Sequence, residues 1–153
     1  MPAILDAIVW LALLGLVGVA LGAAVLRVVE ARIAEVGVAA RTYALACAAG
    51  VAGMIVFANA PRIAIAAAGS LFVTGIAYPV SRTAGVVWVN RRTASVVRAT
   101  VHSMLSQAEQ AGEIVFGALL AVVAGVASIT VALMCSAALL LGAGVLVAVT
   151  RDD

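Results

Sequence analysis

The sequence predicts an all-α, polytopic membrane protein with five transmembrane helices. Of its 153 residues, 66% are hydrophobic and only 10% are charged. A soluble globular protein has about 45–50% apolar and about 25% charged residues, so this chain has too much apolar surface to hide from water. A spanning helix needs about 20 mostly apolar residues. Residues 1–153 are therefore expected to form a single membrane domain without a soluble domain.

Charged residues divide the chain into long uncharged runs. Three of these runs predict helices near residues 4–26, 42–60 and 62–82. The last run, residues 114–150, would extend about 55 Å as one helix, whereas the hydrocarbon core is about 30 Å thick. The chain must therefore turn back, and Gly125–Ser128 is the best place for the turn.

This turn determines where the fourth helix begins. Ile114–Gly125 would cover only about 18 Å as a helix, so it cannot cross the membrane alone. The fourth helix must begin near Val101, and the last two helices are predicted near residues 101–125 and 128–150. Four polar side chains are then drawn into or near the membrane: Gln107, Glu109, Gln110 and Glu113.

The two glutamates of the fourth helix are the main candidates for function. With His102 and Ser106 they fall within an arc of about 60°. An ionised group at the bilayer centre costs roughly 2.5–3.5 kcal/mol, so we expect the arc to face the bundle interior or a water-filled path. Glu113 and Glu109, with Gln107 and Gln110 beside them, are predicted to serve transport or proton coupling. The alternatives are solvation among the lipid headgroups and structural hydrogen bonds to a neighbouring helix.

Small residues predict where helices pack closely. Gly18 and Gly22 form a GxxxG step in the first helix. Gly117, Ala121 and Gly125 repeat at four-residue spacing in the fourth helix. Such rows allow helix backbones to approach closely in lipid, although a chain rich in alanine and glycine also contains them by composition alone.

The arginines predict the orientation in the membrane. Eight of the nine fall on one side, in the loops 27–41 and 82–98 and at Arg151, while Arg62 lies on the other side. The positive-inside rule makes the first side cytoplasmic. Five spans then place Met1 outside, which leads us to expect further helices upstream of it. The expected location is the plasma membrane, as a multi-pass protein.

Other chemistry finds little support in the sequence. Cys47 and Cys135 are isolated in apolar runs and are expected to pack as small apolar side chains. His102 is the single histidine, so no metal site, cofactor or catalytic constellation is predicted and an enzyme is not expected. Arginines in short loops, with no basic run interleaved with aromatics, also argue against nucleic acid as a partner.

The stretch from Pro79 to Ala124 resembles the major facilitator superfamily, and within it the bacterial drug-efflux type. The resemblance rests on a pattern in and around the loop between the third and fourth predicted helices: Pro79, Trp88, Asn90, Arg91, Ser95, Arg98, Ala99, Thr100, Val101, Ser103, Ser106, Gln107 and Gly112. It implies a cytoplasmic loop motif that includes Asn90, Arg91 and Arg98. It also implies twelve helices in two six-helix halves, of which this chain would supply helices eight to twelve.

The sequence therefore favours part of a proton-coupled secondary transporter. It would export small amphipathic molecules by alternating access and would be inactive alone. Its partners would be the lipid bilayer and the missing N-terminal helices or another membrane subunit. The alternative hypothesis is a small membrane interaction or assembly protein, or a degenerate remnant, without transport activity.

Overall fold

The computed structural model describes residues 2–33 and 38–150, and within them the chain is helical without a strand. In these described residues, five helices are long and apolar enough to cross a membrane. The prediction of an all-α chain with five such helices is confirmed, as a multi-pass membrane protein requires. The elements are α1 (Pro2–Ile33), α2 (Val38–Ala58), α3 (Ile63–Phe72), η1 (Val73–Ala77), α4 (Tyr78–Arg92), η2 (Ser95–Val97), α5 (Arg98–Val126) and α6 (Ile129–Val149).

The third span is longer than the sequence predicted, because α3, η1 and α4 form one continuous helix. The uncharged run ends near residue 82, but the helix continues to Arg92. Pro79 does not stop it, although a proline normally clashes with the carbonyl four residues earlier. The chain makes a wider π-helical turn at this place, where the Tyr78 N–H donates to the Val73 carbonyl. The helix ends at Thr93, which has an extended backbone.

The last two spans form a helical hairpin. α5 ends at Val126 and α6 begins at Ile129, so the chain turns inside the segment where the length argument placed the turn. Ser128 is the N-cap of α6, and its hydroxyl accepts a hydrogen bond from the Val131 N–H. Such a cap satisfies one of the backbone donors that a helix start leaves free.

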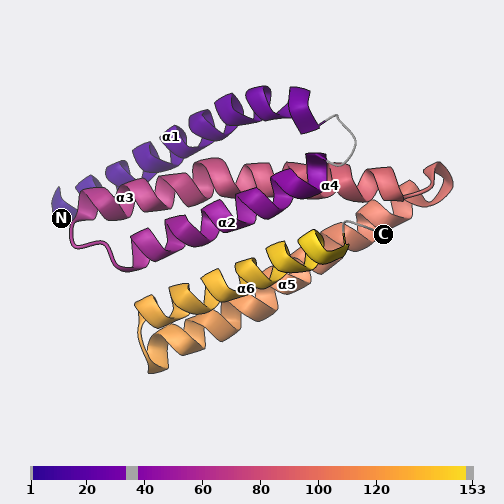
Figure 1. Ribbon diagram of the computed structural model, residues 1–153. Coiled ribbons are helices and arrows are strands. Elements are labelled where there is room, and N and C mark those ends of the chain that lie inside the picture. Colours follow the sequence, from indigo (N-terminus) through magenta and orange to yellow (C-terminus); the bar gives the residue numbers. More distant parts are fainter. Residues whose placement is uncertain (1, 34–37, 151–153) are drawn as a thin grey trace.

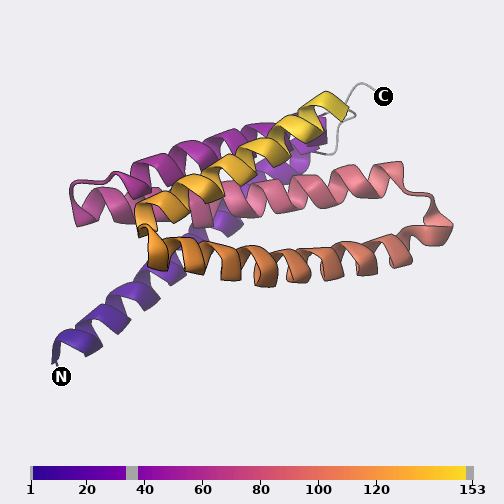
Figure 2. The ribbon, with the colours of Figure 1, turned by 90° about the horizontal axis from the view of Figure 1, so that it is seen from below.

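The helices are arranged around α2. It packs along α6 on one side and against α3, η1 and α4 on the other. α1 lies across the third span, and α5 lies against α6 at the opposite edge of the molecule (Figures 1 and 2). α1 and α5 are thus the two outer helices, and α5 has no buried residue at all.

Glycines bring the central helices close together. A Cβ added to Gly69 would lie 3.0 Å from the Phe57 backbone nitrogen and 3.1 Å from the Gly53 carbonyl oxygen. A Cβ on Gly144 of α6 would lie 2.9 Å from the Cβ of Cys47. In lipid no hydrophobic force drives helices together, so close packing of this kind has to hold the bundle.

The GxxxG step of α1 packs as its spacing predicted. A Cβ on Gly18 would lie 3.6 Å from the Thr74 hydroxyl, and a Cβ on Gly22 would lie 3.2 Å from the Gly75 carbonyl oxygen. The glycines of α5 differ. A Cβ added at Gly117 or Gly125 would meet nothing within 4 Å among the described residues.

Candidate functional site

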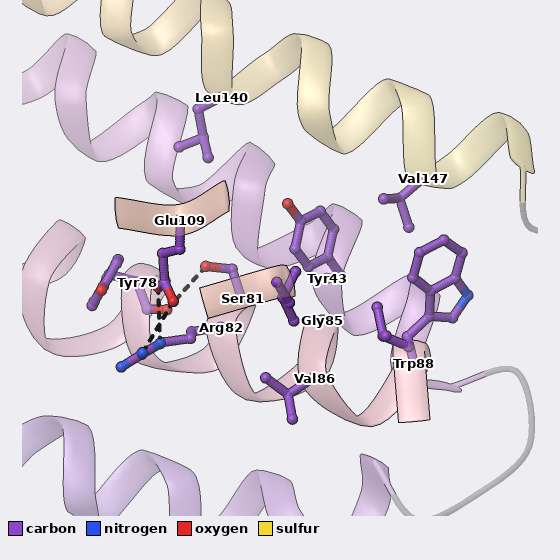
Figure 3. A pocket seen from close by; sticks show the side chains of 12 residues that line it. Tyr43, Tyr78, Ser81, Arg82, Gly85, Val86, Trp88, Glu109, Leu140 and Val147 are labelled. Carbon is purple, nitrogen blue, oxygen red and sulfur yellow. Dashed lines mark hydrogen bonds and ion pairs between the residues drawn. The ribbon is translucent and has the colours of Figure 1, made fainter. Parts of the chain in front are cut away.

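A cavity of about 440 Å³ lies between α2, α4, α5 and α6. Its wall is mostly aliphatic and aromatic, and the two charged residues in the wall, Arg82 and Glu109, form an ion pair (Figure 3). The lining residues are Tyr43, Tyr78, Ser81, Arg82, Gly85, Val86, Trp88, Val89, Leu105, Glu109, Leu140 and Val147. The volume falls in the range of about 300–1,000 Å³ that is usual for small-molecule sites.

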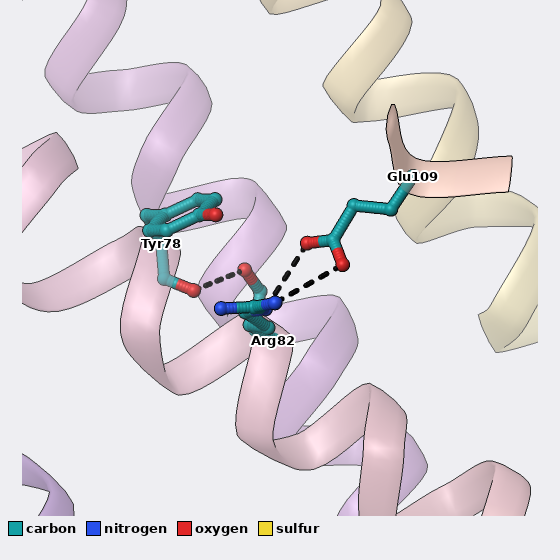
Figure 4. Close-up of polar contacts among 4 residues, drawn as sticks. Tyr78, Arg82 and Glu109 are labelled. Carbon is teal, nitrogen blue, oxygen red and sulfur yellow. Dashed lines mark hydrogen bonds and ion pairs between the residues drawn. The ribbon is translucent and has the colours of Figure 1, made fainter. Parts of the chain in front are cut away.

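Arg82 of α4 and Glu109 of α5 form the ion pair at this cavity. Arg82 Nε lies 3.0 Å from Glu109 Oε1, and Arg82 Nη2 donates to Glu109 Oε2 at 3.1 Å (Figure 4). The two contacts are parallel, which is the strong, orientation-specific form of an arginine–carboxylate pair. Side-chain exposure is 58% for Arg82 and 33% for Glu109, so the pair is open on the arginine's side.

The depth of this pair follows from the helix rise. Arg82 lies about 28 Å along the third span from Ile63, and Glu109 about 26 Å along α5 from Val126. A hydrocarbon core is about 30 Å thick. With one boundary of the core set at Ile63 and Val126, the pair lies just inside the other boundary, toward the end of the bundle that carries Arg91, Arg92 and Arg98.

Glu113 lies one turn deeper on α5 and has a different environment. It is about 20 Å from Val126 along the helix, well inside the core. Its side chain is exposed, and it acts on Arg82 electrostatically without a hydrogen bond in the described part of the chain. Of the two predicted glutamates, the cavity thus takes in Glu109 and leaves Glu113 at its edge.

Part of the predicted polar arc turns away from the bundle. Ser106, Gln110, Glu113 and Gly117 are all exposed and fall within an arc of about 60° on α5. We call these four residues the outer face of α5. Gln107 is exposed as well and lies off this face. Among the four predicted side chains, only Glu109 forms an ion pair with another helix of the described chain.

The predicted loop motif makes one cross-helix contact. Asn90 Oδ1, at the end of α4, bonds His102 Nε2 of α5. This contact and the Arg82–Glu109 pair are about two helical turns apart on each helix, so they bridge α4 and α5 at two levels. Arg91 and Arg98 are exposed at the two helix ends that flank η2.

Arg92 and Trp88 join the cavity to the end of α6. The Arg92 guanidinium carbon stands 4.9 Å from the Trp88 ring centroid, and Arg92 Nη2 donates to the Thr150 carbonyl. The cation at the C-terminal end of α6 also suits the helix dipole. The buried Trp88 Nε1 has no hydrogen-bond partner among the described residues, and it points away from the ion pair (Figure 3).

Sequence reasoning does not find Arg82 as a site residue, because the uncharged run ends there and predicts the end of the helix. One signal was available. Arg82 is separated from Arg91 and Arg92 by eight uncharged residues, with no helix-breaking proline between them. An arginine so far from the loop cluster indicates that the helix of the third span continues past it. On that helix, the arginine can reach a carboxylate on the next span.

Metal chemistry is not suggested by the described residues, where no group of three or more His, Cys, Asp or Glu side chains could hold an ion. Cys47 is buried and Cys135 exposed, and both are free thiols. Comparisons of the chain with protein-family models, with curated proteins and with solved structures find no match.

Proposed function

We propose that the chain is part of a proton-coupled secondary transporter of the major facilitator superfamily that exports small amphipathic molecules. The observation that carries the proposal is the outer face of α5, which presents a carboxylate and an amide at membrane depth on the most exposed helix. Polar groups facing lipid are costly, and in transporters such groups line a cargo or ion path. The loop pattern between α4 and α5 supports the family.

The cavity beside α5 supports a small amphipathic cargo. Most of its lining is apolar, with Tyr43, Tyr78 and Trp88 providing aromatic surface. The Arg82–Glu109 pair provides charges of both signs at one end of it. A few oriented polar groups in an apolar pocket are the usual arrangement of a small-molecule site.

The acidic residues would serve proton coupling. Glu109 is held by Arg82, while Glu113 has no such partner in the described chain. Ionisable side chains within membrane-spanning segments mark ion and proton paths in transporters. We place the acceptor role on Glu113 and a second station on Glu109, with Gln107 and Gln110 as hydrogen-bonding neighbours.

Transport would require more than these five helices. Alternating access works by rocking one helical bundle against another around a site near the midplane. The partner bundle would come from the remaining helices of the transporter, and we place the complex in the plasma membrane. The proposal describes a transporter, because the polar groups at the cavity and on the outer face of α5 are an ion pair and side chains on one helix.

The first test is transport by the chain alone and with its complement. The purified chain in proteoliposomes with a pH gradient is expected to move no fluorescent amphipathic dye. Co-reconstitution with helices encoded by a neighbouring reading frame should restore proton-dependent flux. Robust flux from the isolated monomeric chain would contradict the proposal. Absence of any upstream helix-coding frame would favour the membrane assembly protein instead.

The second test changes one proton site. In a complete transporter, Glu113→Gln keeps the size of the side chain and its hydrogen bonding but removes the titratable proton. Proton-driven flux should fall sharply while expression and folding stay normal. Adding Gln110→Glu, one turn away on the same face, to Glu113→Gln tests whether a nearby carboxyl restores the flux. An unchanged flux and pH profile in Glu113→Gln would leave only a structural role for this residue.

A further inference from the structure

We infer that the outer face of α5 is the docking surface for a transmembrane helix that brings an arginine or lysine to the depth of Glu113. The inference rests on the proposed function, since it gives the chemistry of the segment that completes the transporter. It concerns the four residues Ser106, Gln110, Glu113 and Gly117, which share one side of α5.

Glu113 brings a carboxylate to this surface. The side chain is exposed about 20 Å along α5 from Val126, at a depth where an ionised group facing lipid is costly. Arg82 is the closest cation that acts on it, but two donors of this guanidinium are already bound to Glu109. The described chain therefore leaves the Glu113 carboxylate without a hydrogen-bonded cation.

The shape of the surface also suits a docked helix. Gly117 follows Glu113 by one turn, and a Cβ added there would meet nothing within 4 Å. A small residue beside a charge allows a facing helix to approach closely, so that its cation can reach the carboxylate directly. Gln110, one turn on the other side, can donate and accept hydrogen bonds with the same helix.

A second copy of this chain is a poorer occupant. A parallel copy would need a cation at the depth of Glu113. Arg27 and Arg32 lie in the last two turns of α1, and Arg41 lies in the first turn of α2. Arg62 lies in the turn between α2 and α3, and Arg91, Arg92 and Arg98 lie at the far helix ends. Arg82 is already bound to Glu109. The complementary charge must therefore come from a different polypeptide segment.

The experiment measures binding of a designed peptide to the full chain in lipid vesicles by energy transfer. The peptide is a leucine–alanine helix with a glycine face and one central arginine. The control peptide carries leucine at the position of the arginine. The arginine peptide should bind about tenfold or more tightly than the leucine peptide, because close charge pairs at interfaces couple by at least this much.

Variants of the chain locate the contact. Glu113→Gln should reduce binding of the arginine peptide to the level of the leucine peptide, since the exposed side chain can change without disturbing the fold. Gly117→Leu should weaken both peptides by blocking the approach. Ala118→Leu is the matched control, because Ala118 is also exposed but points to another side of the helix. It should leave binding unchanged.

Two results would overturn the inference. One is equal binding of the arginine and leucine peptides. The other is self-association of the chain that Gly117→Leu abolishes, which would make a second copy the occupant. The outcomes also separate the two proposals. If the chain prefers the arginine peptide but a reconstituted transporter shows no proton-driven flux, only the transport proposal is rejected. If flux occurs but the two peptides bind equally, only the docking helix is rejected.

Discussion

α2 and α5 each contain an 18-residue stretch of the same mean hydropathy, yet the two helices occupy opposite positions in the bundle. α2 lies at the centre and buries six residues, while α5 lies at the edge and buries none. The difference lies in which residues are small and which are polar. α2 offers Gly50 and Gly53 to its neighbours at close range, whereas α5 combines open glycines with a row of polar side chains.

This contrast shows that apolar content determines membrane insertion but not packing. Lipid tails are as apolar as leucine, so burial of apolar surface does not select one helix over another. α2 is central because its backbone can be approached closely from both sides. α5 is held at its inner side by α6 and by two polar contacts to α4, and its outer face is available to another partner.

The largest effect is expected at the α2–α3 crossing. Gly69→Ala places a methyl group 3.0–3.2 Å from backbone atoms of Phe57 and Gly53, which cannot move as a side chain can. Overpacking of this kind costs about 1–3 kcal/mol of unfolding free energy. Unfolding of the purified chain in bicelles by a denaturing detergent measures it. Gly142→Ala, at a glycine with an open surrounding, is the control, and an equal loss there would refute the close crossing.

The second effect concerns the inner side of α5. Arg82→Gln removes the cation that holds Glu109, so α4 and α5 should separate and the cavity should open. Acrylamide quenching of Trp88 fluorescence, in a Trp10→Phe background, should increase. The exchanged pair Arg82→Glu with Glu109→Arg should restore the original quenching. Arg62→Gln, at the other end of the bundle, is the control and should change nothing.

Much of this fold could be predicted from the sequence, and the reasons are physical. The turn at Ala127–Ser128 can be predicted by comparing helix rise with membrane thickness. The last uncharged run would form a helix nearly twice as long as the core is thick, so the chain has to turn back within it. The end of the third span could not be found in this way, since a helix may continue into the headgroup layer once its residues become polar. Pro79 does not end the helix, because the π-helical turn before it accommodates the proline ring.

The site was harder to predict than the fold. Periodicity placed Glu109 and Glu113 on one side of α5, but it could not tell which would meet a cation. That depends on the length of α4, which carries Arg82 to Glu109 across a cavity. A contact between helices depends on their relative positions, and hydropathy does not predict these positions.

A smaller effect is expected at the polar contact near the loop. His102→Leu removes the hydrogen bond to Asn90 and should lower the unfolding free energy by about 0.5–1.5 kcal/mol. The same detergent unfolding experiment measures it. Ser103→Ala, at the exposed neighbouring position, should stay close to the parent chain. Stability of His102→Leu equal to that of Ser103→Ala would show that the Asn90 contact contributes nothing.

The smallest effect has the opposite sign and lies on the outer face of α5. Gly117→Ala meets no neighbour within 4 Å, so the added methyl group strains nothing. A glycine inside a helix is less favourable than alanine by roughly 0.5–1 kcal/mol, and the isolated chain should gain up to that amount. When the arginine-bearing helix is bound, the same methyl group lies in its path, and the variant should bind it more weakly. Gly142→Ala on α6 should gain stability without this loss, because it lies outside the docking surface. A stability loss at Gly117 in the isolated chain would mean that α5 already packs against something on that side, and the contrast between α2 and α5 would then fail.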